Sequence, residues 1–146
     1  MNAYLPHQCC PENRLFCGGQ PDEAQLADFA AAHPGGCVIN LRPASETGDW
    51  DEAAVAKRLG LAYASVPVAG PQDLTQANAA AFARALEAHR GSPMLIHCAT
   101  GQRVGALLAL KAAWVDGCGT ADALVAGRSG GLTALEPQVL DLLSRR

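Results

Sequence analysis

The chain has 146 residues, of which 49% are hydrophobic, and a formal net charge of -3 at pH 7. This length suits one domain that buries its own core without disulfide or metal supports. No basic cluster suggests binding to a nucleic-acid backbone, and no apolar run reaches the length of a membrane span. We therefore expect one cytoplasmic domain over residues 1–146, with residues 1–13 loosely ordered and no nucleic-acid or membrane partner.

The six cysteines are spaced irregularly, and no export signal accompanies them. This pattern predicts reduced thiols rather than a disulfide framework. His7, Cys9 and Cys10 form a fragment of a metal-site pattern, but no second ligand pair follows at zinc-site spacing. We expect neither a metal nor a cofactor.

Short apolar runs bounded by turn-forming residues predict buried strands, whereas longer segments with helix start and stop residues predict helices. In chain order, the predicted elements are a strand at 15–17, a helix at 21–32, a strand at 37–41, a helix at 50–59, a strand at 61–67, a helix at 75–89, a strand at 94–97, and helices at 104–114, 120–126 and from Pro137 to the end. Thr75 and Thr120 are the expected N-caps. Residues 42–48 form a loop, and residues 127–131 a flexible connector.

Strands and helices alternate through most of the chain. This order predicts an α/β fold with a central, mostly parallel sheet that is flanked by helices. In such folds the loops that carry chemistry gather at the carboxyl ends of the strands.

One of these loops joins the apolar strand that ends at His97 to the helix after Arg103. Helix N-termini favour anions, so this position stabilises either a bound phosphate or the thiolate of Cys98. Gly101 allows a close backbone approach, and Arg103 can bind two oxygens at once. A cysteine at a strand end is otherwise commonly a small buried hydrophobe, but these neighbours favour a nucleophile.

The pattern His97-Cys98-x-x-Gly101-x-Arg103 resembles the phosphate loop of cysteine-dependent phosphatases of the protein-tyrosine and dual-specificity type. The bacterial phosphatase-like family named after beta-lactamase hydrolase-like proteins shows further segments of this chain in the same order: Gly18-Gly19-Gln20-Pro21, Val38 to Pro43 with Glu46, Gly60 to Tyr63, and Val66-Pro67-Val68. The resemblance implies a protein-tyrosine-phosphatase-like fold and hydrolysis of phosphomonoesters, with a phosphorylated protein or a small phosphoester as substrate.

Phosphatase chemistry would give these residues defined roles. Cys98 attacks phosphorus, while the phosphate oxygens are held by Arg103 and by the backbone amides of Ala99, Thr100, Gly101 and Gln102. An acid on another loop protonates the leaving oxygen. Asp73 is the first choice, although it could simply favour the start of a helix; Glu46, Asp49 and Asp51 are alternatives.

Three residues have supporting roles. His97 either orients the loop through its backbone or is a satisfied core histidine. Arg42 is more readily explained by an ion pair with Glu46 than by substrate contact. Thr100 is either a hydroxyl of the phosphate loop or an ordinary surface residue.

The loop departs from the phosphatase signature in two ways. Cys98 and Arg103 are separated by four residues rather than five, and Val104 replaces the usual hydroxyl residue. Four is also the spacing in rhodanese-type sulfurtransferases, which carry a persulfide on the cysteine. A sulfurtransferase, or a module that binds phosphate or phosphopeptides without turnover, therefore remains an alternative to a phosphatase. The sequence does not predict the oligomeric state.

Overall fold

The computed structural model describes residues 3–46 and 50–145. The strands are β1 (Cys9–Glu12), β2 (Leu15–Gly18), β3 (Cys37–Asn40), β4 (Ala62–Ser65) and β5 (Met94–His97). The helices are α1 (Glu23–Ala32), α2 (Glu52–Arg58), α3 (Gln76–Ala88), α4 (Gln102–Trp114), α5 (Thr120–Ser129) and α6 (Glu136–Ser144), with short 3-10 turns η1 (Ala44–Glu46) and η2 (Pro71–Asp73).

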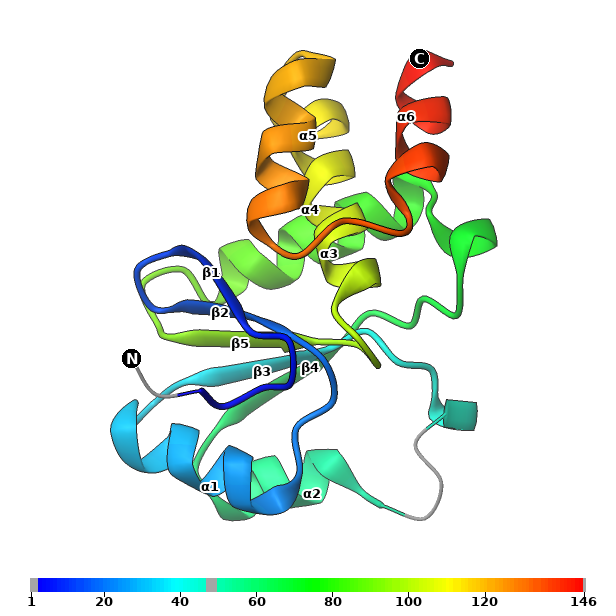
Figure 1. Cartoon of the computed structure of the whole chain (residues 1–146). Helices are drawn as coiled ribbons and strands as arrows, with labels where there is room; N and C mark the ends of the chain where they lie inside the picture. The colour runs from blue at the N-terminus through cyan, green and yellow to red at the C-terminus, as the bar shows by residue number, and fades with distance from the viewer. Residues whose placement is uncertain (1–2, 47–49, 146) are drawn as a thin grey trace.

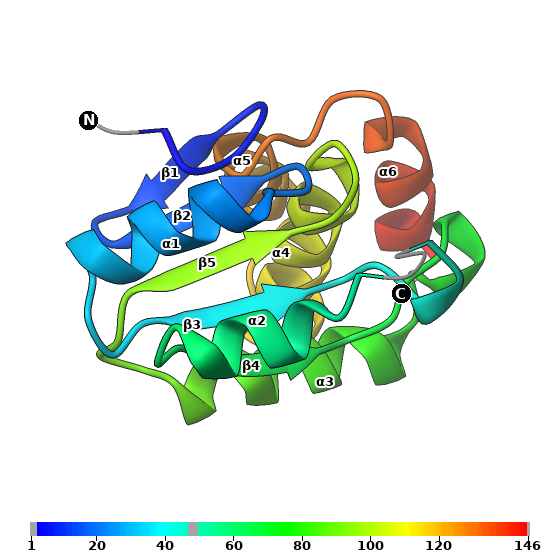
Figure 2. The same cartoon turned by 90° about the horizontal axis from the view of Figure 1, so that it is seen from below.

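The five strands form one sheet in the order β1-β2-β5-β3-β4. β1 pairs with β2 antiparallel, and the other neighbours pair parallel. α1 and α2 cover one face of this sheet, and α3 to α6 lie on the other (Figures 1 and 2). The predicted fold class, a mostly parallel sheet flanked by helices, is confirmed.

The central strands are apolar without alternation because both of their faces are buried. Val38 and Leu95 pack into the cluster beneath α1 and α2. Their chain neighbours Ile39 and Ile96 belong to the larger cluster under α3 to α6. Successive side chains therefore enter opposite halves of the core. β5 lies between β2 and β3, so the loop that follows it starts from a rigid, central position.

Side-chain capping marks the start of α1, α2 and α3. Thr75 accepts a hydrogen bond from the Asn78 amide and caps α3 as predicted. The cap predicted for α5 is wrong, because Gly119 holds the N-cap position and Thr120 already lies in the helix.

Among the described residues, no helix has the length and apolar character needed to cross a membrane.

The predicted flexible connector at 127–131 is wrong in its first part, because α5 continues to Ser129. A close approach between helices explains the difference. A Cβ atom on Gly127 would lie 2.8 Å from Ala109 Cβ and 2.9 Å from the Gly105 carbonyl oxygen. The glycine therefore allows α5 to pack tightly on α4 rather than making this part of the chain flexible.

The segment expected to be loosely ordered is largely part of the fold. Residues 1 and 2 lie outside the described part, but Tyr4 and Leu5 are buried, with exposed fractions of 4% and 3%. Farther along, Cys9–Glu12 forms β1 on the edge of the sheet. The pairing of β1 with β2 and the apolar cluster around Tyr4 supply the order that local propensity did not predict.

Candidate active site

The cysteine loop lies where the sequence predicted it, between the carboxyl end of β5 and the start of α4 (Figure 2). Gly101 is the N-cap of α4 and has a φ of 97°, which favours glycine. This conformation turns the Gly101 amide toward Cys98, and its nitrogen donates a hydrogen bond to Cys98 Sγ at 3.0 Å. Cys98 is fully buried, whereas Ala99 and Thr100 are exposed.

The end of β2 holds the backbone of this loop in place. The Cys98 amide donates to the Gly18 carbonyl, and the Gln20 amide donates to the Ala99 carbonyl, each at 3.2 Å. A Cβ atom on Gly19 would lie 2.6 Å from the Ala99 oxygen. Gly19 therefore allows the loop to approach closely.

Arg103 is buried at the end of the loop and binds a carboxylate from another segment. Its Nη1 and Nη2 atoms donate to the two carboxylate oxygens of Glu46, both at 2.9 Å, and Nη1 also donates to the Val68 carbonyl at 2.7 Å. A guanidinium has five N–H donors. These contacts use three of them, and a further side-chain hydrogen bond links the guanidinium to Cys98, so Arg103 lies beside the sulfur where an anion on the loop would bind.

The contact between Glu46 and Arg103 keeps both groups charged. The hydrogen bond from Arg103 lowers the pKa of Glu46 despite the opposing effect of burial, and the charges of Arg103 and Arg42 lower it further. Burial alone would lower the pKa of Arg103, but the hydrogen bond to Glu46 and the nearby Cys98 raise it. Glu46 is therefore a carboxylate at neutral pH, which argues against its predicted alternative role as proton donor.

Arg42 forms the ion pair with Glu46 that the sequence favoured. Its Nε lies 3.3 Å from Glu46 Oε1, and its Nη2 donates to the Glu46 backbone carbonyl. Its Nη1 donates to Gln20 Oε1 at 2.7 Å. Arg42 therefore fixes Glu46 against Arg103 and connects this pair to the segment after β2.

His97 contacts both the loop backbone and a carboxylate in the core. Its Nδ1 lies 3.4 Å from the Cys98 carbonyl oxygen, so the ring contacts the loop backbone. Its Nε2 lies 2.6 Å from Glu52 Oε2, which makes it a fully buried histidine with a partner in the core. Glu52 is only 3% exposed, and its other oxygen accepts a hydrogen bond from Gln20 Nε2 at 2.7 Å.

Asp73, the first choice for the acid, lies on the loop that contacts Arg103. Its Oδ2 accepts a hydrogen bond from the Ala69 amide at 2.8 Å, next to the Val68 carbonyl that binds Arg103. The side-chain cap of α3 comes from Thr75. Asp73 therefore shapes the loop beside the arginine, and its role as acid stays a prediction.

The remaining acids have different positions. Asp51 is the N-cap of α2, where its side chain accepts from the Ala54 amide at 3.1 Å. This capping contact accounts for the aspartate without a catalytic role. Asp49 lies outside the described residues.

Gln102 directs its side chain away from the loop, toward the connection between α5 and α6. Its Nε2 donates to the Gly131 carbonyl and to Thr133 Oγ1, and its Oε1 accepts from the amides of Thr133 and Leu135. A phosphate-binding role for Gln102 therefore rests on its backbone amide. Its side chain instead ties the start of α4 to the C-terminal helices.

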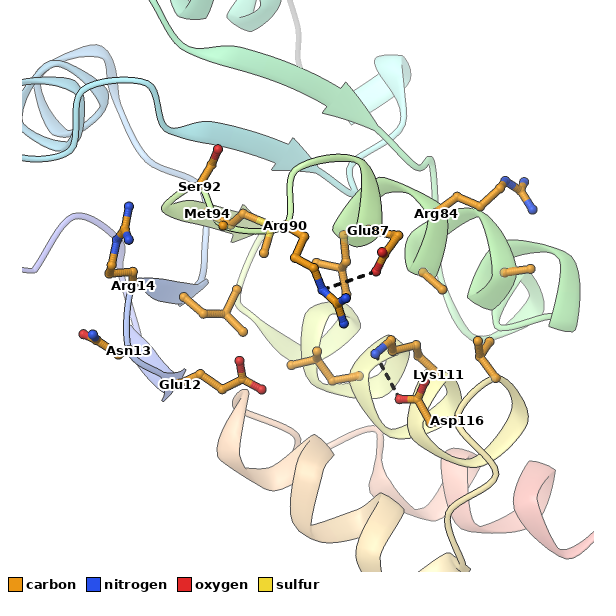
Figure 3. Close-up of a pocket in the computed structure, with 17 residues that line it drawn as sticks. Glu12, Asn13, Arg14, Arg84, Glu87, Arg90, Ser92, Met94, Lys111 and Asp116 are labelled. Atoms are coloured by element: carbon orange, nitrogen blue, oxygen red, sulfur yellow. Dashed lines mark hydrogen bonds and ion pairs between the residues drawn. The ribbon is translucent and has the colours of Figure 1, made fainter.

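A pocket of about 700 Å³ lies at the opposite end of the sheet and contains none of the predicted site residues. It is lined by the starts of β2 and β5 and by the ends of α3 and α4 (Figure 3). Its charged side chains include two visible ion pairs, Arg90 with Glu87 and Lys111 with Asp116.

Within residues 3–46 and 50–145, no three His, Cys, Asp or Glu side chains are grouped as a metal site requires.

Sequence reasoning missed Glu52 as part of this site and did not identify the polar role of Gln20. Glu52 lies in the first turn of α2, where an acidic residue is ordinarily explained by the helix dipole. Gln20 was considered only as part of the Gly18-Gly19-Gln20-Pro21 segment that resembles the family. The available signal for such a site was that polar residues follow several predicted strands. This signal does not indicate which of these residues pair.

Residues 14–115 match the family described as "Beta-lactamase hydrolase-like protein, phosphatase-like domain". The beta-lactamase hydrolase-like protein of Xylella fastidiosa (strain Temecula1) is 41% identical over 102 residues, covering 67% of this chain and 23% of that protein. This chain thus spans about a quarter of the length of the relatives that it matches.

Solved structures share the fold over nearly the whole chain. A candidate phosphatase of Shewanella putrefaciens CN-32 is 25% identical, with a TM-score of 0.73 and coverage of 96% of this chain and 90% of that chain. Tk-PTP in its active form is 21% identical, with a TM-score of 0.67 and coverage of 97% and 98%. The fold is therefore protein-tyrosine-phosphatase-like, and the chain belongs to the phosphatase-like domain family of beta-lactamase hydrolase-like proteins.

Proposed function

We propose that this chain is a cysteine-dependent phosphatase that hydrolyses a phosphorylated protein or a small phosphoester. The observation that carries the proposal is the 3.0 Å hydrogen bond from the Gly101 amide to Cys98 Sγ at the start of α4. A donor at this position and the helix dipole favour negative charge on sulfur and on a bound phosphoryl group. Membership of a phosphatase-like family gives independent support.

In the proposed reaction, the Cys98 thiolate attacks phosphorus and the ester P–O bond breaks. The leaving oxygen takes a proton from Asp73, and water then hydrolyses the S–P bond, which releases phosphate and restores the thiolate. The amides of residues 99–102 and the Arg103 guanidinium bind the equatorial oxygens. No metal or cofactor takes part in these steps.

The test is hydrolysis of an aryl phosphate by the purified chain. Replacing the nucleophile in Cys98→Ser should lower turnover by at least about 1,000-fold. Cys118→Ser makes the same chemical change away from the loop and should leave turnover unchanged. Equal turnover in Cys98→Ser and the unmodified chain would exclude Cys98 from the mechanism.

The proposed acid can be tested separately. Asp73→Asn removes the transferable proton and should lower kcat by about 100-fold for a substrate with a poor leaving group. A substrate whose leaving group needs no protonation should be affected much less. Equal effects on both substrates would show that Asp73 is not the proton donor.

A sulfurtransferase is the second candidate function because three observations depart from what a phosphatase loop needs. The ring from Cys98 to Arg103 is one residue shorter than the phosphatase signature, Cys98 is fully buried, and Val104 offers no hydroxyl. In this reaction the Cys98 thiolate takes the outer sulfur of thiosulfate, sulfite leaves, and a persulfide remains on the cysteine.

Mass spectrometry after thiosulfate treatment distinguishes the two candidates. A sulfurtransferase should gain one sulfur on the peptide that contains Cys98 and then transfer it to cyanide. The Cys98→Ser variant controls for reaction at the other cysteines. Phosphatase turnover without this added sulfur would exclude the second candidate, and sulfur transfer without phosphatase turnover would exclude the first.

A further inference from the structure

A continuous series of polar contacts connects the two ends of the cysteine loop. It starts at the Arg103 guanidinium and returns to the Cys98 backbone carbonyl, with every step within 3.4 Å. Its members, in order, are Arg103, Glu46, Arg42, Gln20, Glu52, His97 and Cys98. We call this series the polar circuit. It crosses between the segments after β2 and β3, the start of α2 and the end of β5.

Gln20 is the neutral junction between the two charged halves of the polar circuit. Its Oε1 accepts from Arg42 at 2.7 Å, and its Nε2 donates to Glu52 at 2.7 Å. An arginine offers only donors, and an ionised carboxylate offers only acceptors. The side chain between them must therefore present an acceptor on one side and a donor on the other, as an amide does.

A further contact holds the Gln20 amide in this orientation. Its Nε2 also donates to the Pro21 carbonyl at 2.8 Å, so both hydrogens of the amide nitrogen have acceptors. The Gln20 backbone amide binds the Ala99 carbonyl within the cysteine loop. Gln20 thus contacts the loop directly through its backbone and connects both loop ends through its side chain.

We propose that Gln20 is a positioning residue that couples the placement of Arg103 to that of Cys98. Side chains that hydrogen-bond one another in a largely buried network restrict each other's motion, so they act together rather than one by one. The inference rests on the proposed chemistry at Cys98, because its role is to keep the guanidinium and the sulfur at the spacing that one tetrahedral anion requires. Gln20 itself does not touch the reacting atoms.

Two substitutions test this role. Gln20→Glu keeps the shape but replaces the donor by an oxygen that faces the Glu52 carboxylate. Gln20→Met keeps the length and removes all three side-chain polar contacts without adding charge. It decides the question if Gln20→Glu fails to fold. Gln138→Glu, at an exposed position on α6, is the matched control for the charge change.

The first measurement is kcat and KM for an aryl phosphate. Both Gln20 variants should lose about 10- to 100-fold in kcat, because small errors in placement slow the chemical step. Gln138→Glu should stay within about twofold of the unmodified chain. A kcat within that range for a folded Gln20→Met variant would overturn the proposal.

The second measurement asks whether the two halves act together, which a merely structural role would not require. Glu46→Gln and Glu52→Gln each remove one charged member, and Gln20 lies between them in the circuit. If the halves are coupled, the double variant should lose less kcat than the product of the two single losses. In the Gln20→Met background the losses should multiply. Multiplicative losses in the presence of Gln20 would overturn the coupling.

A third measurement separates this inference from the proposed function. If the unmodified chain shows no Cys98-dependent turnover, the proposed function fails, but alkylation of Cys98 by iodoacetamide still reports on the loop. Peptide mapping should then show a change of at least about fivefold in the Cys98 alkylation rate in the Gln20 variants. An unchanged rate would overturn the role of Gln20 independently of any turnover.

Discussion

Both ends of the sheet carry many ionisable side chains, but these side chains are mostly buried at one end and exposed at the other. At the carboxyl end, Glu52 and His97 are almost completely buried and lie 2.6 Å apart. At the amino end, the Arg90 and Glu87 side chains are 79% and 68% exposed and lie 3.5 Å apart. The pocket of about 700 Å³ lies at the amino end (Figure 3).

This difference shows that the volume of a pocket indicates a chemical site less well than the unfavourable free energy of burying the charged groups around it. Burying a charged group is unfavourable unless other groups compensate it fully. Exposed pairs such as those near Lys111 cost little and contribute little. The densely paired and mostly buried side chains at the carboxyl end therefore support it as the candidate site.

The largest effect on stability should follow from breaking the buried pair of Glu52 and His97. Glu52→Ala leaves His97 and Gln20 without their carboxylate, so the free energy of unfolding should fall by about 3 kcal/mol. Urea denaturation followed by circular dichroism measures this change. Glu52→Gln retains one acceptor oxygen and should lose less. A loss below about 1 kcal/mol for Glu52→Ala would place the pair with the exposed ones.

The next effect should come from the carboxylate that binds Arg103. Glu46→Gln should lower the free energy of unfolding by about 2 kcal/mol at pH 7, because a charged hydrogen-bond partner is lost. The pKa of Glu46 is lowered in the folded chain, so its contribution is present above the unfolded value of about 4.3 and is lost as the pH falls through the folded value.

Denaturation at a series of pH values checks this sign. The difference between the unmodified chain and Glu46→Gln should shrink steadily as the pH falls below about 4. Glu87→Gln, from the exposed pair at the amino end, is the control and should show little difference throughout. A difference for Glu46→Gln that grows toward acid pH would contradict the prediction.

A smaller effect should distinguish two glycines with similar positive φ values. Gly101 and Gly91 have φ values of 97° and 89°, and Gly91 lines the pocket at the amino end. Alanine at either position should lower the free energy of unfolding by about 1 kcal/mol. Only Gly101→Ala should also lower Cys98-dependent turnover, since it disturbs the amide that donates to the sulfur. Equal turnover in the two variants would refute this distinction.

The smallest effect should follow from Lys111→Ala. Its partner Asp116 and the lysine itself are partly exposed, with side-chain fractions of 42% and 28%. Such a pair contributes less than about 0.5 kcal/mol to the free energy of unfolding. A loss as large as that of Glu46→Gln would remove the contrast between the two ends of the sheet.

Local sequence signals were sufficient for most of the fold and for the centre of the site. The apolar run before His97, the glycine at 101 and the cap at Thr75 act over a few residues, and the structure places each of them as predicted. The ion pair of Arg42 with Glu46 is also local, because the two residues are four positions apart.

The missed features depend on contacts between distant parts of the chain. Glu46 is 57 positions from Arg103, and Glu52 is 45 positions from His97. A single sequence does not show which acidic side chain will pair with which basic side chain after folding. β1 was missed for a related reason, because Pro11 and the short length give it little strand propensity and its order comes from pairing with β2.

The hydrogen bonds from the Gln102 side chain to the segment after α5 have a consequence for truncation of the chain. The family match ends at residue 115, yet Leu132, Val139 and Leu143 beyond it are at most 2% exposed and pack into the main core. A protein shortened to the matched region would lose these apolar contacts and the acceptors that hold the Gln102 side chain. We therefore expect a protein that ends at residue 115 to be less stable than the whole chain, because the core would lose the side chains that the last two helices bury.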